Sequence, residues 1–171
     1  MHFCTINNMA EDLNIPAGIN RTEQYESLIP QLRSIITGET DFVANTGNLM
    51  AGLHSAFGFH WVGCYFVKND QLVLGPFQGP VACTRIALGK GVCGTSWKEA
   101  HTIIVPNVDV FPGHISCSSL SKSEIVVPIF NIENNVIGVL DVDSSELNDF
   151  DQTDQKYLEE IASIISQLAH L

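Results

Sequence analysis

The chain has 171 residues, of which 45% are hydrophobic and 16% are charged, and these values indicate one globular domain and exclude a disordered protein. Its net charge of −11 excludes the basic surface with which proteins bind nucleic acids or anionic membranes. It has no signal-peptide pattern and no apolar run of transmembrane length, so we expect a soluble, cytoplasmic protein. In that compartment its five cysteines start as thiols, which favours a transient disulfide over a structural one.

The first 20 residues have no clear periodicity, and we expect them to form a loosely packed arm before a single domain spanning residues 21–171. Hydrophobic residues recur at helical spacing between residues 25 and 36, with Thr22 as a candidate N-cap. Pro30 conflicts with an unbroken helix, because an interior proline costs about 3 kcal/mol. The sequence therefore predicts a kink or a helix start near Pro30.

Residues 41–57 predict a stronger helix, which ends at Gly58. The hydrophobic period then changes to two, as is typical of strands, and a hairpin turn is expected at residues 68–70. A short helix is expected at 92–100, and Asp151 can cap a C-terminal helix. The expected strands span residues 60–67, 71–74, 82–88, 102–105, 125–131 and 136–143.

This order of elements predicts an α+β fold with a central antiparallel sheet. The N- and C-terminal helices should pack on one face of the sheet. The long irregular insertion at residues 74–124 should cover the other face, and it contains Cys83, Cys93 and Cys117.

Strand alternation predicts which side chains meet beneath this insertion. Trp61 and Tyr65 share one face of their strand, Asp141 and Asp143 share a face of the last strand, and Glu124 begins the strand before it. We expect these five side chains to form the floor of one pocket. The alternatives for them are a solvated sheet face for the acids and ordinary core packing for either aromatic residue.

A cluster of three carboxyl groups needs a compensating group. Two unit charges about 4 Å apart repel by about 4 kcal/mol at an effective dielectric constant of 20. The cluster therefore predicts a shared proton or a bound cation, which could be a metal, an arginine or a ligand ammonium group. The two aromatic rings favour a ligand that also has a soft apolar part.

The cysteines fall into two groups. Cys64 faces the apolar side of its strand and is expected to be a buried structural thiol. Cys93 lies at a predicted helix start, where the helix dipole lowers the pKa of a thiol, and Cys117 lies among small polar residues. Together with Cys83 they surround the candidate pocket, which leaves redox chemistry and a structural role as alternatives.

Two other motifs suggest a dinucleotide-binding loop and a zinc site, but neither fits its context in the chain. Residues 89–94 match the glycine pattern of dinucleotide-binding loops, but the flanking strand and helix are too short. A zinc site would need Cys83, Cys93, His114 and Cys117, whose spacings match no zinc module. We therefore expect neither a cofactor nor a metal.

Seven short segments in this chain form a linked pattern of three cysteines and three acids: residues 61–65, 74–79, 82–86, 89–95, 112–117, 123–128 and 138–144. In this pattern the chain resembles the stand-alone GAF-domain enzymes that are free methionine-(R)-sulfoxide reductases. The resemblance covers roughly residues 25 to 168. It implies a GAF-like fold and thiol-dependent reduction of free methionine (R)-sulfoxide to methionine, with thioredoxin as the reductant.

The resemblance also implies roles for individual residues. Cys117 would attack the sulfoxide sulfur and become a sulfenic acid, and Cys83 would resolve it as a disulfide, with Cys93 as a second candidate. Three acids would bind the substrate ammonium group, and one of them, Glu124 or Asp143, would protonate the leaving oxygen. Two aromatic residues would bind the methyl and sulfur end. The substrate-binding residues implied are Trp61, Tyr65, Glu124, Asp141 and Asp143.

The alternative from another functional class is a GAF sensor that binds a small ligand without turnover. Sensors usually carry output domains, and a simple binding module has no use for three reactive thiols. A homodimer formed through the helical face is expected from the resemblance and from the apolar stripes on the terminal helices.

Overall fold

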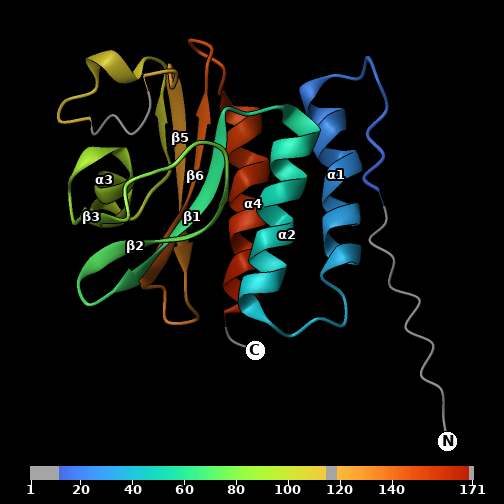
Figure 1. The fold of residues 1–171 in the computed structure, drawn as a ribbon, viewed down its shortest axis with the longest axis horizontal. Coiled ribbons are helices and arrows are strands. Elements are labelled where there is room, and N and C mark those ends of the chain that lie inside the picture. Colours follow the sequence, from blue (N-terminus) through green and yellow to red (C-terminus); the bar gives the residue numbers. More distant parts are fainter. Residues whose placement is uncertain (1–11, 115–118, 170–171) are drawn as a thin grey trace, which may run out of the picture.

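The structure is a computed structural model that describes residues 12–114 and 119–169 (Figure 1). Its elements in chain order are α1 (Arg21–Ile35), α2 (Phe42–Phe57), β1 (Trp61–Lys68), β2 (Gln71–Gln78), β3 (Arg85–Ala87), α3 (Gly91–Glu99), β4 (Ile103–Val105), the 3-10 helix η1 (Val108–Val110), β5 (Ser123–Phe130), β6 (Val136–Ser144) and α4 (Gln152–Leu168). None of the helices in these two described ranges is both long and apolar enough to cross a membrane.

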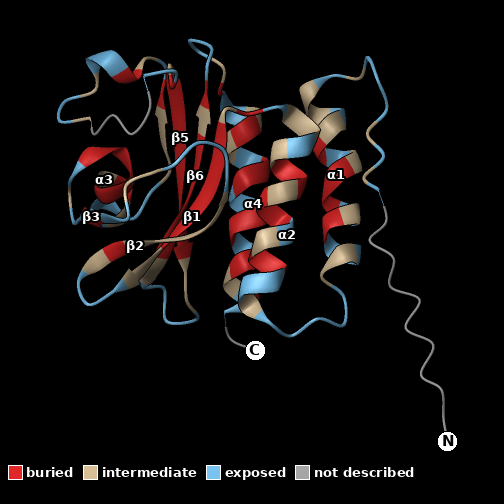
Figure 2. Cartoon of the chain, in the orientation of Figure 1, coloured by how far each residue is buried: buried red, intermediate tan, exposed pale blue. Residues whose placement is uncertain are grey.

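The strands form a six-stranded sheet in the order β3-β2-β1-β6-β5-β4, and all its paired strands are antiparallel. Helices α1, α2 and α4 lie on one side of the sheet, whereas α3 lies on the other (Figure 1). Buried residues concentrate in β1, β5 and β6 and on the helix surfaces that face them (Figure 2). The predicted α+β architecture, with the terminal helices on one face, is confirmed.

Each central strand contributes to two separate hydrophobic cores. Val62 and Cys64 of β1 pack in the core beneath the helical layer, together with Leu140 of β6. Trp61 and Tyr65 of β1 belong to a smaller core on the opposite face. The alternation predicted for these strands is therefore confirmed. The smaller core also includes residues from each element between β2 and η1.

The N-terminal helix differs from the prediction in two respects. Its N-cap is Asn20 rather than Thr22, and the Asn20 side chain and Glu23 form a reciprocal capping box. The helix continues through Pro30, so the predicted start near that residue is wrong. Leu28, Ile29 and Leu32 on either side of the proline are buried, and this packing offsets the loss of one backbone hydrogen bond.

Strand β2 is longer than expected because a bulge accommodates its glycine and proline. Leu74 pairs with Tyr65 and Phe77 pairs with Gly63, so two residues of β2 face the single residue between them on β1. The Gly75-Pro76 pair therefore lies within the strand, although its composition is typical of a chain break.

The predicted hairpin and helix ends are confirmed. Asn69 and Asp70 have φ values of 52° and 58°, which are the left-handed conformations that a two-residue hairpin turn requires. Gly58 ends α2 with a φ of 67°. Asp151 caps α4 through hydrogen bonds from Thr153 and Asp154. The division into an arm and a single domain at residue 21 stays a prediction.

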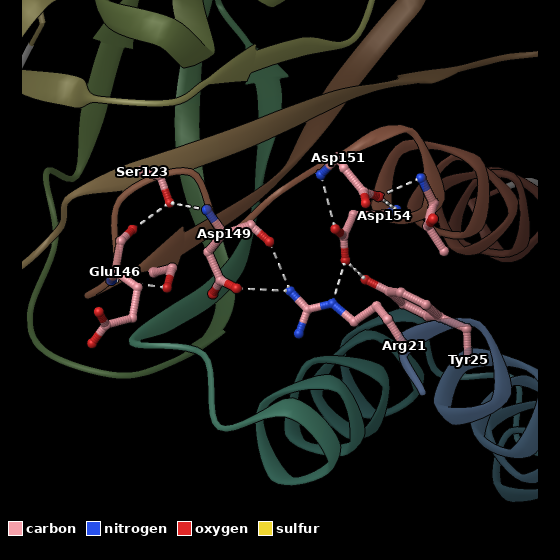
Figure 3. Close-up of polar contacts among 9 residues, drawn as sticks. Arg21, Tyr25, Ser123, Glu146, Asp149, Asp151 and Asp154 are labelled. Atoms are coloured by element: carbon pink, nitrogen blue, oxygen red, sulfur yellow. Dashed lines mark hydrogen bonds and ion pairs between the residues drawn. The ribbon is translucent and has the colours of Figure 1, made fainter. Parts of the chain in front are cut away.

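A polar cluster joins α1 to the start of α4 (Figure 3). Asp154, which is 1% exposed, accepts hydrogen bonds from Arg21 Nε and from the Tyr25 hydroxyl, both at 2.8 Å. Its other oxygen accepts the backbone N–H of Asp151 at 3.0 Å. Arg21 also donates to the carbonyl and carboxylate oxygens of Asp149, at 3.1 and 3.2 Å.

We predict that Asp154→Ala lowers the free energy of unfolding by about 2–4 kcal/mol, because it leaves the buried Tyr25 hydroxyl without its acceptor and removes the Nε partner of Arg21. Urea unfolding at neutral pH measures the loss. Glu160→Ala is the matched control, since it breaks the exposed pair with Arg33 and should cost less than about 1 kcal/mol. Equal losses in the two variants would contradict the prediction.

Candidate active site

The register of β6 brings the predicted pocket residues together. Asp143 lies opposite Trp61 of β1 on one side and opposite Glu124 of β5 on the other. Asp141 lies opposite Gly63. Because alternate strand residues face the same side, all these positions face away from the helical layer.

A pocket opens on this face of the sheet. Its floor contains the five residues predicted for it, which are Trp61, Tyr65, Glu124, Asp141 and Asp143. Cys93 of α3 adds a thiol to the lining, and His114 and Ser121 line it from the segment between η1 and β5. The loop after β2 contributes residues 80–82.

The aromatic side of the pocket is fixed by stacking. Trp61 stacks on Phe77 at a ring-centroid distance of 5.4 Å and on Tyr65 at 6.0 Å. Its indole N–H donates to the carbonyl oxygen of Pro80 at 3.1 Å. Gly63 has no side chain to obstruct the indole, and a Cβ there would lie 2.3 Å from a ring carbon of Trp61. The pocket therefore presents a rigid aromatic surface beside its acids.

Two of the three acids are almost completely shielded from water, whereas Asp143 is partly exposed. Glu124 is 5% exposed and Asp141 is 6% exposed. Burial, followed by the charges of Asp141 and Asp143, raises the pKa of Glu124 well above its usual value. Burial and the charge of Asp143 likewise raise the pKa of Asp141. Burial also raises the pKa of Asp143, to about 6, although a hydrogen bond from Ser121 opposes the change.

These pKa values separate the roles that the acids can play near pH 7. Asp143 ionises most readily and is largely an anion at that pH. Glu124 favours its protonated form, which can donate a hydrogen bond or a proton. The pocket therefore combines an anion that can bind a cation with an acid that can supply a proton.

Cys93 differs from the expectation for a thiol at a helix start. It is 4% exposed, and burial together with the nearby charges of Asp141 and Glu124 raises the pKa of its thiol well above the usual value. The thiol also hydrogen-bonds with Asp141. The predicted lowering of its pKa is wrong, because desolvation and two acids outweigh the helix dipole.

The other cysteines occupy different environments. Cys64 is fully buried, and its sulfur lies 3.7 Å from that of Met50, in agreement with a structural thiol. Cys83 is half-buried in the loop between β2 and β3 and packs against the smaller core. Cys117, the predicted nucleophile, lies outside the described residues. Its role and that of Cys83 stay predictions, as do the roles assigned to the pocket residues.

Two lining residues had no assigned role in the sequence analysis. His114 Nε2 lies 3.7 Å from a carboxylate oxygen of Glu124, and burial lowers the pKa of the imidazole. Both groups therefore favour their neutral forms at pH 7. Ser121 is buried and hydrogen-bonds to Asp143. The sequence signal for His114 was its position after Pro112-Gly113, whereas nothing distinguished Ser121 from the serines around it.

The acids are supported by the polar cluster at the end of the helical layer (Figure 3). Ser123, which precedes Glu124, donates its hydroxyl to the carbonyl oxygen of Glu146 at 2.7 Å and accepts the backbone N–H of Asp149 at 3.4 Å. Asp149 in turn binds Arg21. The loop after β6 is thus held to the start of β5 by Ser123 and to α1 by Arg21.

We predict that Asp143→Asn stabilises the protein at pH 8 but not at pH 4. The folded state holds the Asp143 proton up to about pH 6, whereas the unfolded state loses it near the ordinary value of 3.8, so stability falls as pH rises between these values. Asparagine mimics the protonated form, and we expect a gain of about 1–3 kcal/mol at pH 8. Urea unfolding at both pH values measures it, and a gain of the same size at pH 4 would contradict the assignment.

Comparison with known proteins identifies the family. The GAF-domain family matches residues 40–169. GAF domain-containing protein A of Dictyostelium discoideum is 56% identical over 158 residues, which cover 92% of this chain and 99% of that protein. The free methionine-R-sulfoxide reductase of Escherichia coli is 39% identical over 151 residues, which cover 88% of this chain and 91% of that enzyme.

A solved structure gives the same result. The X-ray structure of the free methionine-R-sulfoxide reductase of Neisseria meningitidis in complex with its substrate is 49% identical in sequence, with a TM-score of 0.89. The similarity covers 93% of this chain and 95% of that one. The chain therefore belongs to the GAF-domain family and, within it, to the free methionine-R-sulfoxide reductases, which are oxidoreductases.

Proposed function

We propose that this protein reduces free methionine (R)-sulfoxide to methionine with cysteine thiols that thioredoxin recycles. The observation that carries the proposal is the buried group of three acids beside a stack of aromatic rings. Free methionine sulfoxide offers an ammonium group to the acids and its methyl and sulfur end to the rings. The proposal is supported by membership of a family whose relatives are named for this reaction.

Substrate recognition follows from the charges. Asp143 and the neighbouring acids attract the substrate ammonium group, whose charge in turn favours their ionised forms. Trp61 and Tyr65 contact the methyl and sulfur end. A methionine sulfoxide within a peptide lacks the free ammonium group, so the acids would be buried without a compensating cation. Such a peptide should therefore be a poor substrate.

The chemical step uses the chain's thiols and one carboxyl proton. The Cys117 thiolate attacks the sulfoxide sulfur while a protonated acid donates to the oxygen, and methionine leaves as Cys117 becomes a sulfenic acid. The raised pKa of Glu124 supports this acid as the donor rather than Asp143. A second thiol then attacks the Cys117 sulfur, which releases water and forms a disulfide that a thioredoxin dithiol reduces.

The environments of the remaining thiols favour Cys83 as the resolving residue. Cys83 is partly exposed in a loop, whereas Cys93 is enclosed among acids that disfavour its thiolate. Reduction by thioredoxin also requires a disulfide that a second protein can reach. A cytoplasmic location and a homodimer formed through the helical layer are further parts of this proposal.

We predict that the protein oxidises thioredoxin with free methionine (R)-sulfoxide but not with the (S)-sulfoxide, as measured by coupled NADPH consumption with thioredoxin reductase. Cys117→Ser should lower turnover by at least about a thousandfold, because no other residue is proposed to attack the sulfur. Turnover that survives in Cys117→Ser would exclude the mechanism. Binding of the sulfoxide without any turnover would instead favour a ligand-binding GAF sensor.

We predict that Cys83→Ser prevents formation of the intramolecular disulfide when one equivalent of substrate is added, as read by peptide mass spectrometry. One equivalent of methionine should still form, because the first attack requires only Cys117. Cys93→Ser is the matched comparison and should retain a disulfide between Cys83 and Cys117. A disulfide between Cys93 and Cys117 in the wild-type protein would overturn the assignment.

A further inference from the structure

The thiol of α3 and two of the buried acids form a set of metal-ligand type. Cys93 Sγ and carboxylate oxygens of Glu124 and Asp141 all lie within 4.8 Å of one another, and all three residues are buried. In a tetrahedral site, Zn–S and Zn–O bonds of about 2.3 and 2.1 Å place the ligand atoms about 3.5 Å apart. Side-chain rotations that move these atoms by about 1 Å would therefore bring all three around one ion.

The same set contains a buried carboxylate oxygen that has no hydrogen-bond partner among the described residues. Asp141 Oδ1 is inaccessible to water and has no hydrogen-bond partner within residues 12–114 and 119–169. Asp141 as a whole is 6% exposed and lines the pocket. A buried carboxylate oxygen without a partner costs free energy because it loses its hydration, and a bound cation would offset that cost.

We propose that Cys93, Glu124 and Asp141 bind a divalent transition-metal ion of the Zn²⁺ class, with water in a fourth position. One thiolate with two carboxylates is a donor set for Zn²⁺ or Co²⁺, whereas Mg²⁺ and Ca²⁺ take oxygen ligands alone. Asp143 lies next to Glu124 across the strand pair and adds negative charge beside the ion. The dication would offset the repulsion among the acids.

This set is different from the zinc ligands considered in the sequence. Those were Cys83, Cys93, His114 and Cys117, whose spacings match no zinc module. The proposed ligands come from α3, β5 and β6, and only the packing of α3 on the sheet brings them together. A site of this kind leaves no spacing pattern in the chain.

Metal binding and substrate binding should exclude each other. Glu124 and Asp141 would ligate the ion, and the proposed function assigns the same carboxylates to the substrate ammonium group. This competition rests on the proposed function, whereas metal binding itself does not. The ion would act as a reversible inhibitor that keeps the reductase inactive when such metals are abundant.

The test is a titration of the reduced, metal-free protein with Co²⁺, because a cobalt–thiolate bond gives a charge-transfer absorption in the near ultraviolet. We expect one equivalent to bind with this band, Zn²⁺ to displace it, and Mg²⁺ to leave it unchanged. Cys93→Ser should abolish the band. Glu124→Gln should keep a cobalt–thiolate band but raise the apparent Kd at least about tenfold.

Cys83→Ser is the matched control, since it removes a thiol beside the pocket and should leave the band and the apparent Kd unchanged. A band that persists in Cys93→Ser, or one that disappears in Cys83→Ser, would overturn the site. The circular dichroism of each variant shows whether it is folded. If Cys93→Ser unfolds, the absence of the band in Cys93→Ala and the raised apparent Kd of Glu124→Gln test the site instead. Wild-type protein without a cobalt–thiolate band also refutes the proposal.

A second titration separates this inference from the proposed function. Free methionine sulfoxide is added in excess to the Cys117→Ser variant, which should not turn it over. It should raise the apparent Kd for Co²⁺ beyond the rise that an equal concentration of glycine causes by chelating the ion. If the band forms as expected but the sulfoxide has no effect, the metal site is supported and the proposed binding of the substrate to the acids is wrong.

Discussion

The pairing of β6 with its two neighbours is the constraint on which the site depends. Asp143 is opposite both Trp61 and Glu124, and a shift of one residue would turn the acids toward the helices. The other face of β6 excludes that shift, because Leu140 and Val142 are fully buried in the helical core. The hydrophobic face of the strand therefore fixes the position of the acids on its opposite face.

The two faces of the sheet differ in what they contribute. The helical face holds the larger core and the cluster around Asp154, which stabilise the fold. The pocket face places Glu124 and Asp141 where water scarcely reaches them, with Asp143 beside them, and the pKa values of all three acids are raised, which lowers stability at neutral pH. Such a cluster is unfavourable by itself, and a bound cation would make it more favourable. The stability that the helical layer contributes offsets the cost of burying these acids.

Burial and neighbouring charge give the cysteines different chemistry. Cys64 lies among apolar side chains, and burial raises the pKa of its thiol. Cys93 is equally shielded but lies beside acids, which makes it a poor nucleophile and a potential metal ligand. Cys83 is partly exposed in a loop, where a second thiol or a second protein can approach. Residue type alone does not separate these three environments.

Periodicity in the sequence determined the fold class, most elements and the side chains on each strand face, because these depend on neighbours along the chain. Strand alternation puts Trp61 and Tyr65 on one face of their strand, and Asp141 and Asp143 on one face of theirs, which was enough to predict the pocket floor. The helix through Pro30 and the bulge at Gly75-Pro76 depended on packing against distant residues, which local patterns do not contain. The N-cap at Asn20 is different, because its capping box with Glu23 is a local signal in the sequence.

Only the tertiary structure decided the environment of each pocket group. It placed Cys93 against the acids, which reversed the direction expected for the pKa of its thiol. It also brought His114 to Glu124 and Ser121 to Asp143 from a segment with no regular pattern. Desolvation and charge act through space, so they follow from the packing of α3, His114 and Ser121 around the acids and not from order along the chain.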